Sequence, residues 1–211
     1  MQGTLGLIFL VVLVAQWSGM GAAMGKRAGP FQSAVLSRVD SLPAPSGQES
    51  QATFAAGCFW GVQLAFQRLP GVLSTKVGYT AGKKEAPSYE EVCSGKTGHT
   101  EAVQMTFDPA QISFRDLCRV FFEIHDATQL NRQGNDRGTQ YRSGIYTHSD
   151  GQQAEALEEK ARHEQAIVKR VVTEVQRAGK FWEAEKYHQA YLVKGGQTGT
   201  KGSDKPIRCY G

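Results

Sequence analysis

Cys58 lies in the segment Gly57-Cys-Phe-Trp-Gly61, before a stretch with helical spacing of apolar residues. The spacing predicts a helix that begins at Cys58 and ends before Pro70. Unpaired N–H groups and the helix dipole favour an anion in the first turn, so the thiol pKa should fall and the sulfur should become a nucleophile. Phe59 and Trp60 could form an apolar cup for a small uncharged group. A buried core cysteine is the alternative, although the flanking glycines allow close backbone approach.

The elements that must position this cysteine follow from apolar periodicity and turn residues. We expect strands at residues 53–56, 72–79, 100–107, 141–147 and 171–176. We expect helices at residues 58–69, 113–124, 150–166 and 184–193, with loops over 83–98 and 129–139. Strands and helices mixed with long loops, without an internal repeat, indicate one α+β domain.

Composition and charge exclude several classes of protein. The chain has 211 residues with ordinary glycine and charge content, so it is neither collagen-like nor wholly disordered. Its 24 Lys and Arg residues are nearly balanced by 20 acidic residues and are scattered along the chain, which argues against nucleic acid as a partner. Four cysteines are too few for a disulfide-held mini-protein. The cysteines and histidines lack C-x-x-C and H-x-x-x-H spacings, so we expect no metal site.

The first 50 residues differ from the rest in composition. Residues 1–25 carry no charge, and an apolar run followed by small residues predicts a signal peptide or signal anchor over residues 1–23. Residues 24–50 are rich in Gly, Pro and Ser, which predicts a disordered linker or a transit-like segment. We therefore expect targeting to the secretory pathway. The final location would be the endoplasmic reticulum, the cell exterior, or a plastid reached through a two-part leader.

Gly57-Cys-Phe-Trp-Gly61 resembles the active-site motif of the A-type peptide methionine sulfoxide reductases. Seven further segments resemble that family in the same order: Val77–Gly82, Ser88–Ser94, Thr97–Val103, His125-Asp126, Arg132–Asp136, Gly138–Ser143 and Tyr187–Gln189. The resemblance covers about Thr53 to Leu192, nearly the whole folded part. It implies a single ferredoxin-like α/β sandwich domain with long loops over residues 51–193, followed by a flexible C-terminal tail over residues 194–211.

The resemblance implies a role for each residue of a candidate site. Cys58 would attack the sulfur of the S epimer of methionine sulfoxide, free or in proteins, and become a sulfenic acid. Glu101 would protonate the departing oxygen, because burial in a strand raises a carboxyl pKa. The remaining matches are Phe59 and Trp60 as the wall around the methyl group, Tyr89 and Tyr141 as phenols that bind the oxygen, and Asp136 as a pocket carboxylate. Taken singly, each has a simpler explanation as a packing or surface residue.

A second thiol must then reduce the sulfenic acid. Cys209 lies in a glycine-rich tail that resembles the tail of plant-type members, and this implies a Cys58–Cys209 disulfide that thioredoxin reduces. Those members often carry another cysteine shortly before; Lys201-Gly-Ser203 stands there instead, which implies a cycle of two cysteines. Cys93 and Cys118 are interpreted as structural. We expect a monomer with no bound cofactor, thioredoxin as its reductant and oxidised methionine as its substrate.

Two other functions stay open. A cysteine hydrolase would use Cys58 with a histidine that the fold must position. The chain departs from the family pattern at three positions: Gln63 in place of Glu, Ala127 in place of Pro, and Lys186 in place of an acidic residue. Gln63 and Lys186 would fit a non-catalytic sulfoxide-binding protein, although the presence of Cys58, Glu101 and Cys209 argues against it. Turnover of methionine sulfoxide with a dithiol reductant separates these functions, because only the reductase releases methionine.

Overall fold

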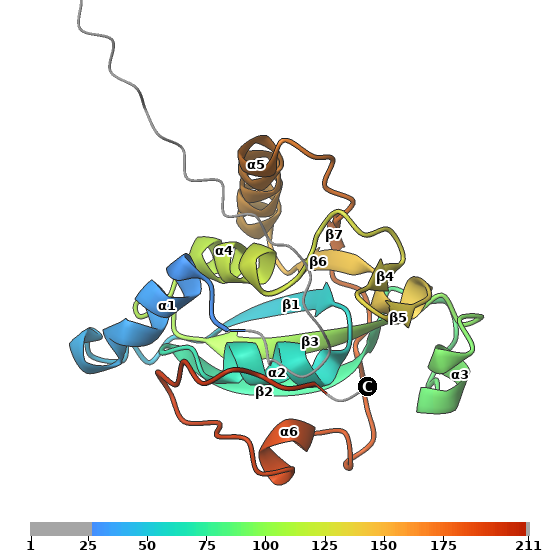
Figure 1. Cartoon of the computed structure of the whole chain (residues 1–211), viewed down its shortest axis with the longest axis horizontal. Coiled ribbons are helices and arrows are strands. Elements are labelled where there is room, and N and C mark those ends of the chain that lie inside the picture. Colours follow the sequence, from blue (N-terminus) through green and yellow to red (C-terminus); the bar gives the residue numbers. More distant parts are fainter. Residues whose placement is uncertain (1–26, 210–211) are drawn as a thin grey trace, which may run out of the picture.

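The computed structural model describes residues 27–209 (Figure 1). The signal peptide or anchor predicted over residues 1–23 lies outside the described residues. Within residues 27–209, no helix has the length and apolar character needed to cross a membrane.

A mixed sheet forms the centre of the molecule. In the described part of the chain its strands are β1 (Ser50–Ala56), β2 (Val72–Thr80), β3 (Thr100–Phe107), β6 (Ser143–Thr147), β7 (Glu174–Arg177) and β8 (Trp182–Glu183). Their order is β7-β6-β1-β3-β2-β8; the inner strands β6, β1, β3 and β2 are antiparallel to one another, and β7 pairs with β6 in parallel. A short second sheet pairs β4 (Arg132–Gln133) with β5 (Asp136–Arg137).

Helices connect these strands in the order of a ferredoxin-like fold. The helices are α1 (Pro30–Leu36), α2 (Phe59–Gln67), α3 (Tyr89–Cys93), α4 (Phe114–Ile124), α5 (Asp150–Ile167) and α6 (Tyr191–Lys194), with 3-10 turns η1 (Ser37–Ser41) and η2 (Thr139–Tyr141). Helix α2 joins β1 to β2, and α4 joins β3 to β6, so the inner unit runs β-α-β-β-α-β. The predicted α+β single domain with a ferredoxin-like sandwich is confirmed.

Alternation along β1 and β3 builds the core. Phe54 of β1 is fully buried, and its ring stacks against Phe66 of α2 and against Phe114 and Phe121 of α4. Val103, Met105 and Phe107 of β3 point to this same core, as their spacing predicts. Cys118 of α4 is also fully buried, which agrees with its interpretation as a packing residue.

The segment predicted as a disordered linker contains a docked helix, α1. The side chains of Val35 and Leu36 are buried, and both carboxylate oxygens of Glu123 in α4 accept from the backbone N–H groups of Phe31 and Gln32. This part of the prediction over residues 24–50 is wrong, because a seven-residue helix is marginal alone and its stability comes from tertiary contacts. Composition does not report such contacts.

Other differences lie near element ends. The helix expected over 150–166 is α5, and Ser149 caps it, since its side chain accepts from the Gln152 N–H. The helix predicted over 184–193 is reduced to α6, because Ala190 takes a left-handed backbone conformation. The loop predicted over 83–98 contains the short helix α3, which begins with a capping box at Ser88.

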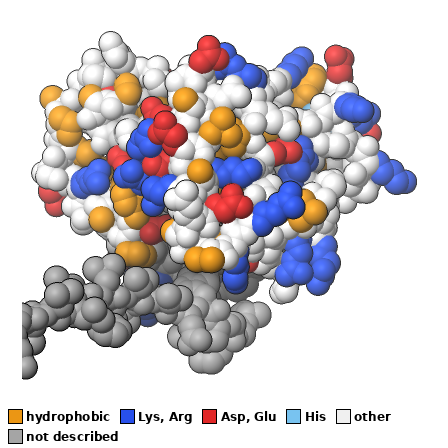
Figure 2. Space-filling model, turned by 90° about the horizontal axis from the view of Figure 1, so that it is seen from above, with side chains coloured by type: hydrophobic (Ala, Val, Ile, Leu, Met, Phe, Trp, Pro, Cys, Tyr) orange, Lys and Arg blue, Asp and Glu red, His pale blue; other side chains and the backbone are white. Residues whose placement is uncertain are grey.

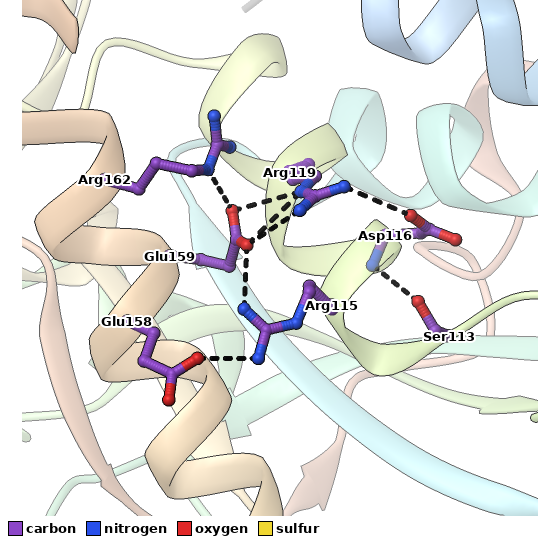
Figure 3. Close-up of polar contacts among 7 residues, drawn as sticks. All are labelled: Ser113, Arg115, Asp116, Arg119, Glu158, Glu159 and Arg162. Carbon is purple, nitrogen blue, oxygen red and sulfur yellow. Dashed lines mark hydrogen bonds and ion pairs between the residues drawn. The ribbon is translucent and has the colours of Figure 1, made fainter.

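A buried carboxylate joins α4 to α5 (Figure 3). Glu159 of α5 is 1% exposed, and its oxygens accept hydrogen bonds from Arg115, Arg119 and Arg162. Paired, hydrogen-bonded charges of this kind hold the two helices in one register.

The outer surface in Figure 2 carries acidic and basic side chains interspersed, without a single-sign patch on that face.

Candidate active site

Cys58 occupies the N-cap position of α2, directly after β1 ends. Gly57 before it has φ of +91°, and a Cβ there would lie 2.6 Å from Cβ of Gln133 in β4. A side chain at position 57 would therefore be strained and would also clash, so only glycine fits this turn. The sharp turn leaves the Cys58 sulfur at the start of the helix, as predicted.

Glu101 lies beneath the start of α2. It shares the core-facing side of β3 with Val103, and it is 2% exposed. Its Oε2 accepts a hydrogen bond of 3.0 Å from the Phe59 N–H, in the first turn of α2. Burial raises the pKa of Glu101 to about 8, with Asp136 adding to the rise. The carboxyl is therefore mostly protonated at neutral pH and can donate a proton beside Cys58.

The sulfur of Cys209 lies 3.5 Å from that of Cys58, although 151 positions separate them in the chain. The contact is a hydrogen bond that raises the pKa of Cys58, and burial raises it further. The expectation of a lowered thiol pKa does not hold in this arrangement, because the lowering effect of the Trp60 N–H is outweighed. Cys58 is thus a protonated thiol while Cys209 is docked beside it.

Phe59 and Trp60 form an aromatic wall after the cysteine. Phe59 is 1% exposed, and the partly buried Trp60 stacks on Tyr191 with ring centres 4.0 Å apart. The indole Nε1 donates to Nδ1 of His188 at 3.1 Å, which fixes the plane of the Trp60 ring. Such a rigid apolar wall suits a methyl group.

The two predicted phenols and the predicted carboxylate gather near Glu101. Burial raises the pKa of Tyr89 and of Tyr141, and the charge of Glu101 contributes to both shifts. Burial also raises the pKa of Asp136, which interacts electrostatically with Glu101. Both phenols therefore stay protonated across the physiological range and can donate hydrogen bonds to an oxygen.

Sequence reasoning assigned no role to two residues that support this site. Glu185 accepts from the Tyr79 hydroxyl at 2.9 Å and from the Tyr89 N–H at 3.0 Å, so it fixes the start of α3. His188, 2% exposed, orients Trp60 and packs against the ring of Tyr89. The matching segment Tyr187–Gln189 was a signal for His188, whereas Glu185 had no signal because its partners lie about 100 positions away.

Cys93 and the three unusual residues also have defined positions. Cys93 hydrogen-bonds with Tyr89, so it lies beside the phenols rather than in the main core. Gln63 is buried; its Oε1 accepts from the Ala190 N–H while its Nε2 donates to the carbonyl of Thr75, and an ionised glutamate could not donate to that carbonyl. Ala127 is buried in the core and Lys186 is exposed.

The geometry defines a class of site: a cysteine at a helix start, a second thiol in contact with it, and a buried protonated carboxyl at the same turn. These are the parts of a thiol-dependent oxidoreductase. The hydrolase alternative would require a histidine at Cys58, whereas the partner found at its sulfur is another thiol. Within residues 27–209, no group of three His, Cys, Asp or Glu side chains is arranged to hold a metal ion.

Comparison with known proteins agrees with this class. The family model for peptide methionine sulfoxide reductase matches residues 50–206. Peptide methionine sulfoxide reductase A4, chloroplastic, from Arabidopsis thaliana is 50% identical over 198 residues, which are 92% of this chain and 76% of that protein. The chain belongs to the A-type peptide methionine sulfoxide reductases and reduces methionine sulfoxide.

Solved structures share the fold. The crystal structure of Mxr1 from Saccharomyces cerevisiae in reduced form has a TM-score of 0.68 and 36% sequence identity, and it covers 75% of this chain and 92% of that chain. Mxr1 in complex with Trx2 has a TM-score of 0.50 and 23% identity, over 72% of this chain and 90% of that chain. The second comparison concerns the fold alone.

Proposed function

We propose that Cys58 is the nucleophile and Glu101 the proton donor in reduction of the S epimer of methionine sulfoxide. The observation that carries this proposal is the 3.0 Å hydrogen bond from the Phe59 N–H to Glu101, which holds a buried carboxyl at the turn that bears Cys58. The Cys58 thiolate attacks the sulfoxide sulfur, and Glu101 protonates the departing oxygen. The attack forms an S–S bond and expels the protonated oxygen as hydroxide. Hydroxide then attacks the Cys58 sulfur, the S–S bond breaks, methionine leaves with the electron pair, and Cys58 becomes a sulfenic acid.

We propose that the surrounding residues recognise the oxygen and the methyl group of the sulfoxide at separate places in the site. The phenols of Tyr89 and Tyr141 donate hydrogen bonds to the sulfoxide oxygen, and Asp136 lines the same region. Phe59 and Trp60 contact the methyl group, since an apolar wall favours an uncharged group there. Polar donors on one side and aromatic rings on the other bind one arrangement of oxygen and methyl around a chiral sulfur, which supports the choice of the S epimer.

We propose that Cys209 reduces the sulfenic acid. Its thiol attacks the sulfenic sulfur, a Cys58–Cys209 disulfide forms, and the oxygen leaves as water. The 3.5 Å separation of the two sulfurs supports this step. Thioredoxin then reduces the disulfide. The solved complex of the yeast relative Mxr1 with Trx2 supports a thioredoxin as partner, and we propose that the protein works as a monomer with no bound cofactor.

Turnover of the two separated sulfoxide epimers tests these roles. We expect release of methionine from the S epimer only, and none from the Cys58→Ser variant. Cys209→Ser should turn over with dithiothreitol and fail with thioredoxin, because the small thiol reaches the sulfenic acid directly. Cys118→Ala is the matched control, since Cys118 is buried in the core and should affect neither assay. Full thioredoxin-dependent activity in Cys209→Ser would contradict the resolving role.

We propose a plastid as the final location, reached through a leader that precedes α1. The Arabidopsis relative named chloroplastic supports this, as does the need for a reductant in every cycle. Docking of α1 on α4 argues that the leader ends before Pro30. A fluorescent reporter fused after residue 50, with sequencing of the mature N-terminus, tests the proposal; export from the cell would refute it.

A further inference from the structure

Residues 195–209 run along α2 rather than away from the domain (Figure 1). The tail therefore meets both ends of the helix that carries the nucleophile. At the C-terminal end of α2 the tail contacts Arg68 and the turn that follows. At the N-terminal end of α2, Cys209 of the tail contacts Cys58. A Cβ at Gly61 of α2 would lie 3.8 Å from the side chain of Cys209 and 4.0 Å from that of Ile207, so the tail lies close over the helix.

Lys201 anchors the tail to the end of α2. Its Nζ donates to the backbone oxygens of Gln67 at 2.6 Å, Leu69 at 3.1 Å and Val72 at 2.5 Å. The last carbonyls of a helix lack partners within the helix and carry its negative dipole end. The Lys201 ammonium group satisfies the Gln67 carbonyl at the end of α2, and its bonds to Leu69 in the following turn and to Val72 at the start of β2 fix this part of the tail.

Arg68 provides a second anchor on the same turn. The side chain is 2% exposed; its Nε donates to the Thr198 oxygen at 2.9 Å and its Nη1 to the Lys205 oxygen at 2.6 Å. Its own carbonyl accepts from the Gly202 N–H at 2.9 Å. One buried guanidinium thus holds both ends of the segment 198–205.

A third contact lies directly before the cysteine. The amide oxygen of Gln197 accepts from the Arg208 N–H at 3.0 Å, and its Nε2 donates to the Arg208 oxygen at 2.5 Å. Arg208 is exposed and Gln197 is half-buried, and both hydrogen bonds lie at the surface, so water can replace them at little cost. The tail thereby divides into an anchored base, residues 198–205, and a terminal arm that begins at Pro206.

We propose that Arg68 and Lys201 are positioning residues that keep the resolving cysteine within reach of Cys58 by anchoring residues 198–205 to the end of α2. The inference rests on the proposed role of Cys209. The arm from Lys205 to Cys209 spans at most about 13 Å, at ~3.3 Å per residue. Cys209 can therefore withdraw from Cys58 to admit the sulfoxide, and return when the sulfenic acid has formed.

Anchoring raises the concentration of one thiol around the other. With the base anchored, about four residues connect Cys209 to the domain; with the base released, about 15 residues connect it to the end of α6. Effective concentration falls roughly as the −3/2 power of the length, so release of the base should slow disulfide formation about sevenfold. Reduction of the sulfoxide should not slow, because that step does not use the tail.

The test follows one turnover of the full chain. The reduced enzyme is mixed with methionine S-sulfoxide without reductant and is quenched at intervals. Methionine release reports the first step, and mass spectrometry separates Cys58 trapped by dimedone as a sulfenic acid from the Cys58–Cys209 disulfide. Variants are Lys201→Gln, Arg68→Gln with Lys201→Gln, and Lys201→Arg. Lys205→Gln is the matched control, because only its backbone oxygen contacts Arg68.

We expect unchanged methionine release in every variant, disulfide formation about sevenfold slower in the double variant, and a smaller delay in Lys201→Gln that Lys201→Arg reduces. Since Arg68 is buried and its variant could fail to fold, Lys201→Gln alone is sufficient; its side chain lies at the surface. Disulfide formation at the wild-type rate in Lys201→Gln would overturn the anchoring role and leave the role of Cys209 intact. A wild-type enzyme that forms no Cys209 disulfide would overturn both.

Discussion

Replacement of Glu101 by glutamine tests the assignment of the proton donor. Burial raises the pKa of Glu101 from 4.5 to about 8. At pH 7 about nine-tenths of the groups would then be protonated, against about 0.3% for an ordinary glutamic acid, so burial supplies roughly a 300-fold gain in the donor form. Glutamine keeps the shape and the acceptor for the Phe59 N–H but has no proton to give. We expect kcat/KM to fall by about 10² to 10⁴-fold.

The sharper measurement is the pH dependence of the ratio between the methionine-release rates of wild type and of Glu101→Gln. The ionisation of Cys58 affects both, so the wild-type to Glu101→Gln ratio isolates Glu101. The active form is the acid, hence the ratio should be constant below pH 7 and should fall about tenfold between pH 7 and pH 9 for a pKa of about 8. Single-turnover methionine release, measured with the S epimer from pH 6 to 10, provides the rates. A ratio that is constant over this range would refute a proton-donor role for Glu101.

The same pKa has a consequence for stability. Since the folded-state pKa of Glu101 lies above 4.5, the folded protein keeps a proton that the unfolded chain releases, and stability is lost as pH rises from 4.5 through about 8. The difference corresponds to at most about 5 kcal/mol, at ~1.36 kcal/mol per pKa unit. Urea unfolding should therefore show Glu101→Gln gaining stability relative to wild type from pH 5 to pH 9. An equal difference at both pH values would contradict the buried, protonated state.

Further predictions concern four other positions. Cys209→Ala should lower the pKa of Cys58 and speed its alkylation by iodoacetamide at pH 7, because the largest cause of the raised pKa is removed; slower alkylation would argue against it. Glu159→Gln should cost about 1–3 kcal/mol in urea unfolding, and Glu158→Gln less than ~0.5, since only the first carboxylate is buried. Gly57→Ala should abolish sulfoxide reduction through strain at φ +91°, with activity near wild type as the contrary result.

Local patterns in the chain were sufficient for most of the fold. Alternation over 100–107 matched β3 at both ends, and the helix expected over 113–124 is α4, which Ser113 caps. The helix over 184–193 and the linker over 24–50 were wrong for one physical reason. Short segments of four to seven residues, such as α1 and α6, take their structure from partners elsewhere in the chain.

The candidate site shows the same division. Glycine before Cys58, the cysteine at a helix start and the apolar residues after it are local features, and they point from the sequence to Cys58 as the proposed nucleophile. The raised pKa of Glu101, the support of Trp60 by His188 and the contact between two sulfurs 151 positions apart depend on burial and on long-range packing. Charge and proximity at a site are properties of the surrounding atoms, and only the folded chain brings those atoms together.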